Sequence, residues 1–295
     1  MNRRVLLALP AIFYPALALS QARPICIVVP FPPGGAGGNI AAEVVARATP
    51  DSATLFPGSA TIFCANRYLY RGAMPFDTLR DFAHVSRVSV GTTLLATRAD
   101  RPWESDVGLV AAAKQAPGRL TAGNSGWGTI RNLTIAKFCK VAGIEVSQVP
   151  YRGLAPGLND LIAGNLDLIF DGMPAIVPHV REGRLRALAV GSADRVTYVP
   201  GIETVPSMTE LAPGSGMDMA FWYCISTPAA TPGEVVDRLH QAVVGAARTR
   251  TYADKLLPLG FAAIMDDSPA GFTEFIRAQD AVWKDLVELY GVRLE

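Results

Sequence analysis

Four short loops rich in glycine and serine are the parts of this sequence best suited to chemistry. They read PGGAGG at residues 33–38, PGSAT at 57–61, GNSGWGT at 123–129 and PYRG at 150–153. We expect each loop between a strand end and a helix start, where unpartnered backbone N–H groups carry a partial positive charge. Because glycine lets an anion approach these groups closely, such loops can hold a carboxylate or a phosphate.

The same loops have an ordinary interpretation, because glycine and serine also form turns without any ligand. Four of them at strand ends make the binding interpretation about as well supported as the turn interpretation. In an open α/β sheet the loops at the carboxyl ends of the strands gather where ligands bind. Backbone amides in such a site need no buried lysine.

Known catalytic and metal-binding patterns are missing from the sequence. The three histidines, His84, His179 and His240, have no metal-binding spacing. The nearest approach to the G-x-S-x-G nucleophile motif is GNSGW at residues 123–127, which lacks the final glycine. No phosphate-binding lysine motif and no complete G-x-G-x-x-G occur either. We therefore expect a binding protein with no catalytic residue, metal or cofactor.

Composition bounds the class of protein. The chain has 295 residues, 50% of them hydrophobic, which is enough for one large domain or two lobes. Its 27 Lys and Arg residues nearly balance its 26 Asp and Glu residues, and the formal charge is +1. Since no basic stripe neutralises phosphates, we expect no nucleic-acid partner.

The first 22 residues have the pattern of an export signal. Arg3 and Arg4 precede an uncharged apolar run at residues 5–19, and small residues follow at the expected cleavage site after Ala22. The alternative is a membrane anchor, but a spanning helix needs roughly 20 apolar residues and this shorter run contains two prolines. Since no second apolar run follows, we expect a protein that is soluble in the periplasm after cleavage of residues 1–22.

The four cysteines, Cys26, Cys64, Cys139 and Cys224, contain no C-x-x-C pair. Each lies among apolar residues, where a free thiol packs as a small hydrophobic side chain. We expect buried free thiols, although a disulfide remains the alternative, because the sequence alone leaves cysteine pairing open.

Strands and helices alternate along the chain, which predicts parallel sheets covered by helices on both faces. The predicted strands lie at residues 24–31, 53–56, 92–97, 120–122, 146–149, 166–170, 185–190 and 261–265. The predicted helices lie at residues 40–48, 106–115, 130–141, 157–163, 174–182, 231–249, 252–259 and 270–290.

From Pro24 to Glu295 the chain resembles the solute-binding proteins of tripartite tricarboxylate transporters, the Bug family. The matching strings include IVVPFPPGG at residues 27–35, PFDTLRDFAHVSRV at 75–88 and PGRLTAGNSGWGT at 117–129. The resemblance implies a type II periplasmic-binding-protein fold with two lobes, each a mainly parallel sheet flanked by helices. Its ligand, in a cleft between the lobes, would be a dicarboxylate, tricarboxylate, amino acid or aromatic acid.

The resemblance also implies the residues of the ligand site. Backbone amides from each lobe would hold a carboxylate directly or through ordered water, and other residues would line the rest of the site. The amide-bearing residues are Phe31, Gly34, Gly35, Ala36, Gly126, Trp127, Gly128 and Thr129. The lining residues are Ser59, Ala60, Thr61, Tyr151, Gly153 and Asp171.

Two lining residues have alternative roles. Tyr151 follows a proline at a strand end, so it either contacts the ligand or packs inside its lobe. Asp171 would repel an anion, unless it accepts a hydrogen bond from an amine or hydroxyl of the ligand or caps a helix. The implied partners are membrane transporter subunits or a sensor kinase, and we expect a monomer.

The stretch PFPPGGAGGNI, residues 30–40, departs from the family pattern. Relatives place a strand and a helix between the two glycine pairs, a unit of roughly 30 residues, and here the pairs are separated by one alanine. The predicted strand at residues 24–31 would then form the edge of its sheet. Either the helix at residues 40–48 inherits the amide site through Gly37 and Gly38, or binding is lost.

These alternatives give two functional hypotheses, a carboxylate receptor and a degenerate paralogue that binds no ligand or only partner proteins, as in a sensor. An exported enzyme is the least supported class.

Lobe I is predicted to contain residues 23–96 and 222–295, and lobe II residues 97–221, with two chain crossings as the hinge. The loop at residues 123–129, in the undisturbed lobe, is the more secure half of the site.

Overall fold

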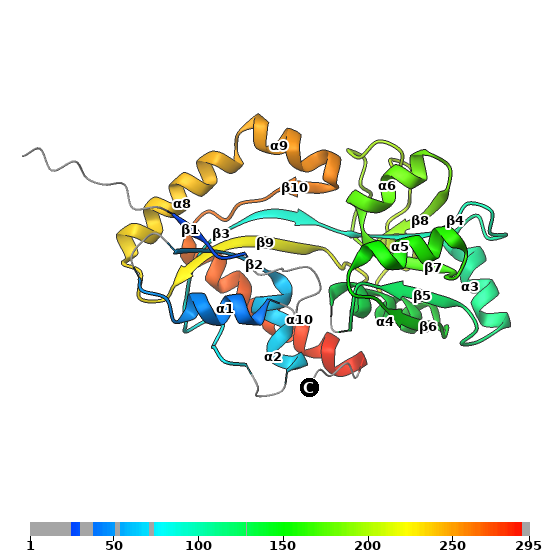
Figure 1. Cartoon of the computed structure of the whole chain (residues 1–295), viewed down its shortest axis with the longest axis horizontal. Helices are drawn as coiled ribbons and strands as arrows, with labels where there is room; N and C mark the ends of the chain where they lie inside the picture. The colour runs from blue at the N-terminus through cyan, green and yellow to red at the C-terminus, as the bar shows by residue number, and fades with distance from the viewer. Residues whose placement is uncertain (1–24, 30–37, 51–53, 71–73, 128, 291–295) are drawn as a thin grey trace, which may run out of the picture.

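The computed structural model describes residues 25–29, 38–50, 54–70, 74–127 and 129–290. These residues form two five-stranded sheets that lie end to end along the long axis of the molecule, each flanked by helices (Figure 1). The strand orders are β1-β2-β9-β3-β10 and β6-β5-β7-β4-β8. Two lobes of α/β type are therefore present, as the sequence predicts.

The first lobe is built from the two ends of the chain. Its strands are β1 (Cys26–Ile27), β2 (Thr54–Ser59), β3 (Phe82–Gly91), β9 (Phe221–Pro228) and β10 (Phe261–Ala263). Its helical elements are α1 (Asn39–Ala46), the π-helix η1 (Thr61–Ala65), α2 (Asn66–Leu69), α8 (Gly233–Ala247), α9 (Arg250–Leu256), the 3-10 turn η2 (Leu257–Leu259) and α10 (Pro269–Tyr290).

The second lobe is built from the middle of the chain. Its strands are β4 (Thr93–Arg98), β5 (Thr121–Asn124), β6 (Ser147–Pro150), β7 (Leu168–Gly172) and β8 (Leu185–Val190). Its helices are α3 (Asp106–Gln115), α4 (Ile130–Ala142), α5 (Leu154–Ala163), α6 (Met173–Arg181) and α7 (Met208–Leu211). Leu94 and Leu95 of β4 face opposite cores, because successive strand residues alternate between faces.

The sheets are mixed, so the expectation of mainly parallel sheets is wrong. Among the described strands, only β1–β2, β5–β6 and β5–β7 pair in parallel. Every other pairing is antiparallel. The reason is that β3, β4 and β9 belong to the segments that join the lobes and run against their neighbours. The sequence analysis missed β3 and β9, whose buried positions include polar residues such as His84 and Ser226.

The chain crosses between the sheets at two places. Only Thr92 separates β3 from β4, and Phe221 at the start of β9 pairs with Gly91. Residues 93–96 therefore lie in the second sheet and Phe221 in the first, which corrects both predicted boundaries. The apolar string TTLLAT could pack in either sheet, so its sequence did not show to which one it belongs. We place the proposed hinge at Thr92 and at residue 220.

An aromatic cluster surrounds a buried histidine in the core of the first lobe. The ring centroid of His84 lies 4.8 Å from that of Phe63 and 5.6 Å from that of Phe272. Its Nδ1 lies 3.0 Å from Ser226 Oγ and its Nε2 lies 2.9 Å from the carbonyl oxygen of Thr78. Burial lowers the pKa of His84 from 6.5 to about 4, so the ring is neutral at pH 7.

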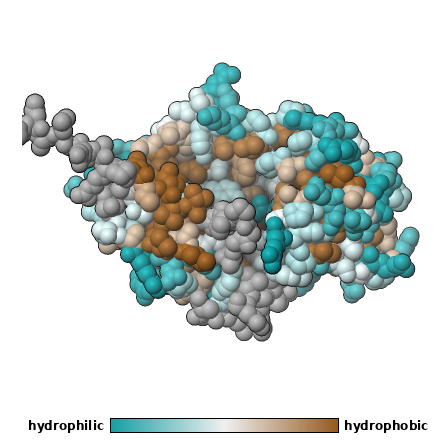
Figure 2. All heavy atoms as spheres, viewed as in Figure 1, coloured by the Kyte–Doolittle hydropathy of each residue, from teal (hydrophilic) through white to brown (hydrophobic). Residues whose placement is uncertain are grey.

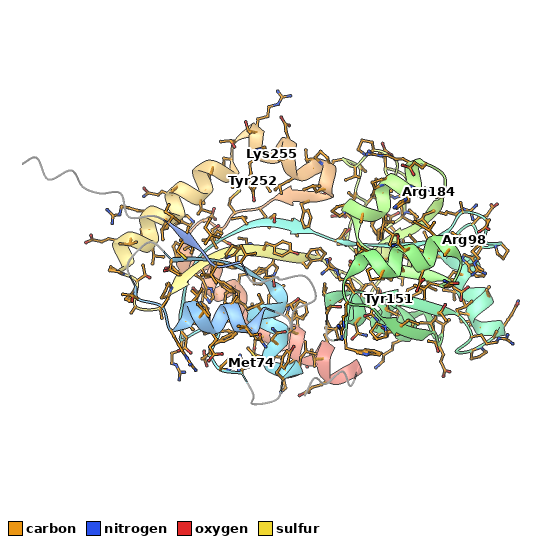
Figure 3. All side chains as sticks on the ribbon, in the orientation of Figure 1. Met74, Arg98, Tyr151, Arg184, Tyr252 and Lys255 are labelled. Carbon is orange, nitrogen blue, oxygen red and sulfur yellow. The ribbon has the colours of Figure 1, made fainter. Side chains whose placement is uncertain are left out.

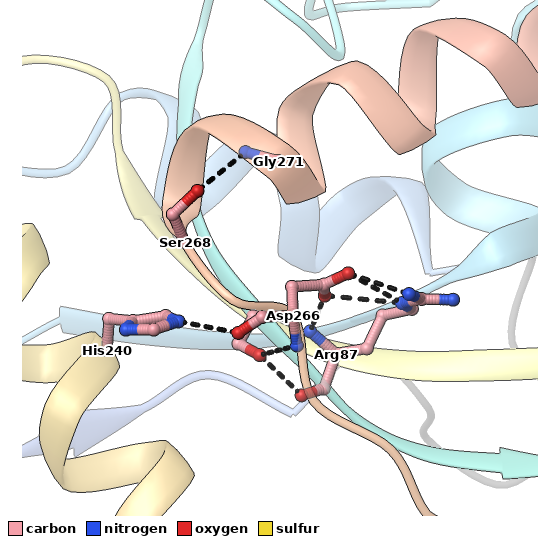
Figure 4. Close-up of polar contacts among 6 residues, drawn as sticks. Arg87, His240, Asp266, Ser268 and Gly271 are labelled. Carbon is pink, nitrogen blue, oxygen red and sulfur yellow. Dashed lines mark hydrogen bonds and ion pairs between the residues drawn. The ribbon is translucent and has the colours of Figure 1, made fainter.

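An ion pair fastens β3 to the start of α10 in the same lobe (Figure 4). The Nη2 and Nε atoms of Arg87 lie 2.7 and 3.0 Å from Oδ1 of Asp266, and the guanidinium lies 3.9 Å from the centroid of the Phe275 ring. The backbone N–H of Arg87 donates to Asp266 Oδ2 at 2.8 Å, and His240 bonds the Asp266 carbonyl at 2.8 Å. Both carboxylate oxygens of Asp266 are thus satisfied.

Strand β1 is the edge of the first sheet, as expected for a shortened lobe. Ile25, Ile27 and Val29 are 65%, 58% and 63% exposed. Ile40 and Val44 of α1 are also exposed, and Figure 2 shows a hydrophobic patch over these two elements. The first strand is therefore poorly covered on its outer side.

All four cysteines are free, and two of them are buried as expected. Burial raises the pKa of the Cys64 and Cys224 thiols well above the ordinary value. Cys139 is half-buried, whereas Cys26 is exposed, and here the expectation is wrong because no described strand lies outside β1. Within the described ranges, no helix is long and apolar enough to cross a membrane.

Candidate functional site

The loop between β5 and α4 is held by its own hydrogen bonds. The N–H of Gly126 donates to Oδ1 of Asn124 at 2.9 Å, which commits this amide inside the loop. Thr129 caps α4, since its Oγ1 accepts from the N–H of Asn132 at 3.3 Å and donates to the Gly126 carbonyl at 2.7 Å. The Gly126 amide is therefore less available to a ligand than the sequence analysis expected.

The backbone donors of this loop that the described residues leave unused lie one step further along the chain. Ile130 and Arg131 begin α4, so their N–H groups precede the first helical hydrogen bond. These two groups have no partner among the described residues. Trp127 is 49% exposed beside them, and Gly128 lies outside the described residues. An anion at this helix start would meet Ile130 and Arg131 rather than Gly126.

Asp171 is buried at the end of β7 and pairs with an arginine. It is only 2% exposed, and its Oδ1 accepts from Arg131 Nε at 3.0 Å and from the N–H of Gly172 at 2.7 Å. The Arg131 guanidinium lies 4.9 Å from the centroid of the Phe221 ring. Oδ2 of Asp171 is buried without a hydrogen-bond partner in the described part of the chain.

Sequence reasoning missed Arg131 and Phe221. Only the position of Arg131 in the first turn after the glycine loop could have suggested a role. Its partners lie 40 and 90 residues further along the chain, beyond the reach of a local pattern. Asp171 does not repel an anion freely, because Arg131 balances its charge.

The first-lobe loop joins β2 to the π-helix η1. Ser59 is 6% exposed, and its Oγ lies 3.5 Å from the N–H of Ile62. Ala60 is buried and Thr61 is half-buried at the start of η1, and π-helical turns are frequent at functional sites. The other predicted residues of this lobe lie outside the described residues: Phe31, Gly34, Gly35 and Ala36.

Tyr151 has a packing role inside the second lobe. Its hydroxyl donates to Oδ2 of Asp160 at 2.7 Å, and burial together with this bond raises the pKa of Tyr151 to about 12. Its ring lies against Gly157, where an added Cβ would come within 3.0 Å, and Figure 3 shows it beside α5. Gly153 precedes α5 with φ 98°, a conformation that favours glycine. Because the hydroxyl of Tyr151 already donates to Asp160, packing inside the lobe is favoured over contact with the ligand.

The loop between β5 and α4 and the end of β7 lie where the two lobes meet. The parallel strands β5 and β7 bring Asn124 and Asp171 to the same edge of the second sheet. Ile130 of α4 belongs to the core cluster of the first lobe. On another side, Met173 at the start of α6 lies against Gly260, which follows η2. The lobes therefore touch on both sides of the candidate site.

Residues 18–292, nearly the whole chain, match the tripartite tricarboxylate transporter family receptor. The chain belongs to this receptor family. The "UPF0065 protein in tcbD-tcbE intergenic region" of Pseudomonas sp. strain P51 is 29% identical over 91% of this chain and 86% of its own length. Protein BugT of Bordetella pertussis is 26% identical over the full length of both chains. The Bug resemblance is therefore confirmed.

Solved structures of other receptors have the same fold. The structure of R. palustris Rpa4515 with adipate superposes with a TM-score of 0.81 at 29% identity, covering 92% of this chain and 98% of that one. The structure of a periplasmic transporter also gives 0.81, at 27% identity over 94% and 100% of the two chains. The two-lobed binding-protein fold is thus established for this receptor.

The alignment with BugT runs over 331 positions, whereas this chain has 295 residues. The receptor therefore lacks segments that BugT contains.

Proposed function

We propose that this receptor is exported to the periplasm and binds a small carboxylate for a tripartite transporter. The observation that carries the proposal is the likeness to the protein solved with adipate, which extends over almost all of both chains. The family is one of receptors, and we propose no enzymatic step. The receptor would be a monomer, and a transporter subunit or a sensor kinase would bind its closed form.

The local geometry supports a carboxylate at the start of α4. The N–H groups of Ile130 and Arg131 have no described partner, and a helix N-terminus favours negative charge. Ser59, Ala60 and Thr61, at the turn that begins η1, would contribute the part of the site from the first lobe. Trp127 and Gly153 would line the edge of the same site, and ordered water would bridge the longer contacts.

The second candidate function is that of a paralogue that binds no ligand. The exposed edge strand β1 and the segments of BugT that this chain lacks favour it. The sequence PFPPGGAGGNI, in which two glycine loops are expected to be fused, suggests that the first amide site is altered. The undisturbed order of β5, α4 and β7 in the second lobe favours the receptor instead.

Thermal denaturation with added acids tests the two candidates. Adipate, malate, citrate, glutamate and benzoate are added to the purified mature protein, and the neutral adipamide is the control. A ligand present at 100 times its Kd stabilises the folded state by about 2.7 kcal/mol, which raises Tm by several degrees. If a folded protein shows no shift with any acid, the receptor proposal is wrong and the non-binding paralogue is favoured.

A further inference from the structure

The guanidinium of Arg131 is only partly used by the protein. An arginine side chain has five N–H donors, and within the described residues Arg131 makes one side-chain hydrogen bond, from Nε to Asp171. The Nη1 and Nη2 groups of Arg131 have no described partner, and the side chain is 23% exposed. A fork of donors is therefore held at the junction of the lobes, and no described residue accepts from it.

The position of this guanidinium is fixed on two sides. Asp171 holds its Nε edge, and the ring of Phe221 lies 4.9 Å from Cζ. Arg131 and Asp171 belong to the second lobe and Phe221 to the first sheet at the hinge. A group bound by Nη1 and Nη2 would therefore lie beside the segment that joins the lobes.

Arg87 in the first lobe has a structural role, and its contacts can be compared with those of Arg131. It also has one carboxylate partner and one aromatic ring, at 3.9 Å. Asp266, however, takes both its Nε and its Nη2, so the carboxylate occupies one whole edge of the guanidinium. At Arg131 the Asp171 carboxylate takes Nε alone, so neither N–H of Nη2 has a partner among the described residues.

We infer that Arg131 is a specificity-determining residue that binds the carboxylate of the ligand through Nη1 and Nη2. The inference deepens the proposed function and rests on it. The two parallel N–H donors of the fork match the two oxygens of a carboxylate, which a single ammonium does not reproduce. Asp171 is the positioning residue that holds the guanidinium by its Nε.

Isothermal titration with adipate tests this role in the mature protein. Arg131→Gln removes the charge and the fork, and Arg131→Lys keeps the charge but removes the fork. We expect a loss of affinity on the order of 10- to 100-fold for Arg131→Gln, and a smaller loss for Arg131→Lys. If adipate does not bind the wild type, titration uses the panel acid that gives the largest Tm shift.

The matched control is Arg101→Gln. Arg101 pairs with Asp167 at 2.7 Å and lies 5.7 Å from the Trp103 ring, so it has the same kinds of partner. Asp167 precedes β7 and Asp171 is near its end, roughly 13 Å apart at the rise of a strand. We expect Arg101→Gln to change affinity by less than about 3-fold, because it alters no group at the site.

The outcomes separate the two proposals. Equal affinity of the wild type, Arg131→Gln and Arg131→Lys overturns the role of Arg131 but leaves the receptor function standing. A wild type that binds no acid of the panel overturns both. If Arg131→Gln does not fold, as judged by circular dichroism, the comparison of Arg131→Lys with wild type decides, and unchanged affinity there overturns the fork.

Discussion

At the residue scale, His84 shows how burial sets the chemistry of a side chain. The ring lies among Phe63, Phe82 and Phe272, and its two nitrogens bond Ser226 and Thr78. These contacts satisfy the neutral ring, whereas protonation would place a charge in an apolar cluster. His84 therefore belongs to the core and not to the ligand site.

His84 should make the protein less stable as the pH falls. Its folded pKa of about 4 is below the ordinary 6.5, so the unfolded state binds the proton first and stability is lost between pH 6.5 and 4. The loss is at most about 3 kcal/mol, at 1.36 kcal/mol per pKa unit. Urea unfolding of the wild type and His84→Gln at pH 7 and 4.5 measures it. The variant should lose less stability, and equal losses would contradict the assignment.

The candidate site shows the limit of residue-scale reasoning from sequence. The loop at residues 123–129 was found from its glycines, and Thr129 does cap α4. The sequence did not reveal that Asn124 uses the Gly126 amide, because that bond depends on the folded turn. It also missed the contact of Arg131 with Phe221, since no local pattern relates positions so far apart.

At the scale of elements, local signals placed most helices well. The helix predicted at residues 106–115 is α3 with the same bounds, and Ser105 caps it. The helix predicted at 130–141 is α4, which ends at Gly143 with φ 63°. Capping residues and hydrophobic spacing are local, so the sequence carries them in full. Strands β3 and β9 depend on partners from distant segments, and they were missed.

Replacing two different glycines by alanine should have opposite effects on stability, because their backbone conformations differ. Gly143 has φ 63° and open space around its Cα, so Gly143→Ala should cost about 1 kcal/mol from backbone strain alone. Gly245 lies inside α8, also in open space but without positive φ, so Gly245→Ala should add about 0.5–1 kcal/mol. Chemical unfolding gives both values. Changes of the same sign would show that backbone conformation does not decide these positions.

At the scale of the whole molecule, the arrangement of the lobes depends on contacts that neither lobe makes alone. Gly260, which follows η2, lies against Met173 at the start of α6. A Cβ at residue 260 would lie 2.8 Å from Met173 Cβ. A side chain at residue 260 would therefore clash with Met173 unless one of the two segments moves.

Gly260→Ala should separate the lobes on this side. We expect a loss of about 2–4 kcal/mol of unfolding free energy, from strain plus overpacking. The radius of gyration in small-angle X-ray scattering should also increase. Gly118→Ala is the matched control, since Gly118 has φ 71° but nothing within 4 Å, and it should cost only about 1 kcal/mol. Equal effects of the two variants would show that the Met173 contact does not hold the lobes together.

The sequence by itself determined the α/β class, the receptor family, most helices and the glycine loop of the second lobe. These features depend on local spacing, capping residues and ordered motifs, which can be recognised in the sequence without knowing the fold. The tertiary structure decided that the sheets are mixed, that residues 93–96 join the second sheet and that Arg131 meets Asp171 and Phe221. Each of these depends on pairing between segments far apart in the chain, where burial and register choose among partners that the sequence leaves equivalent.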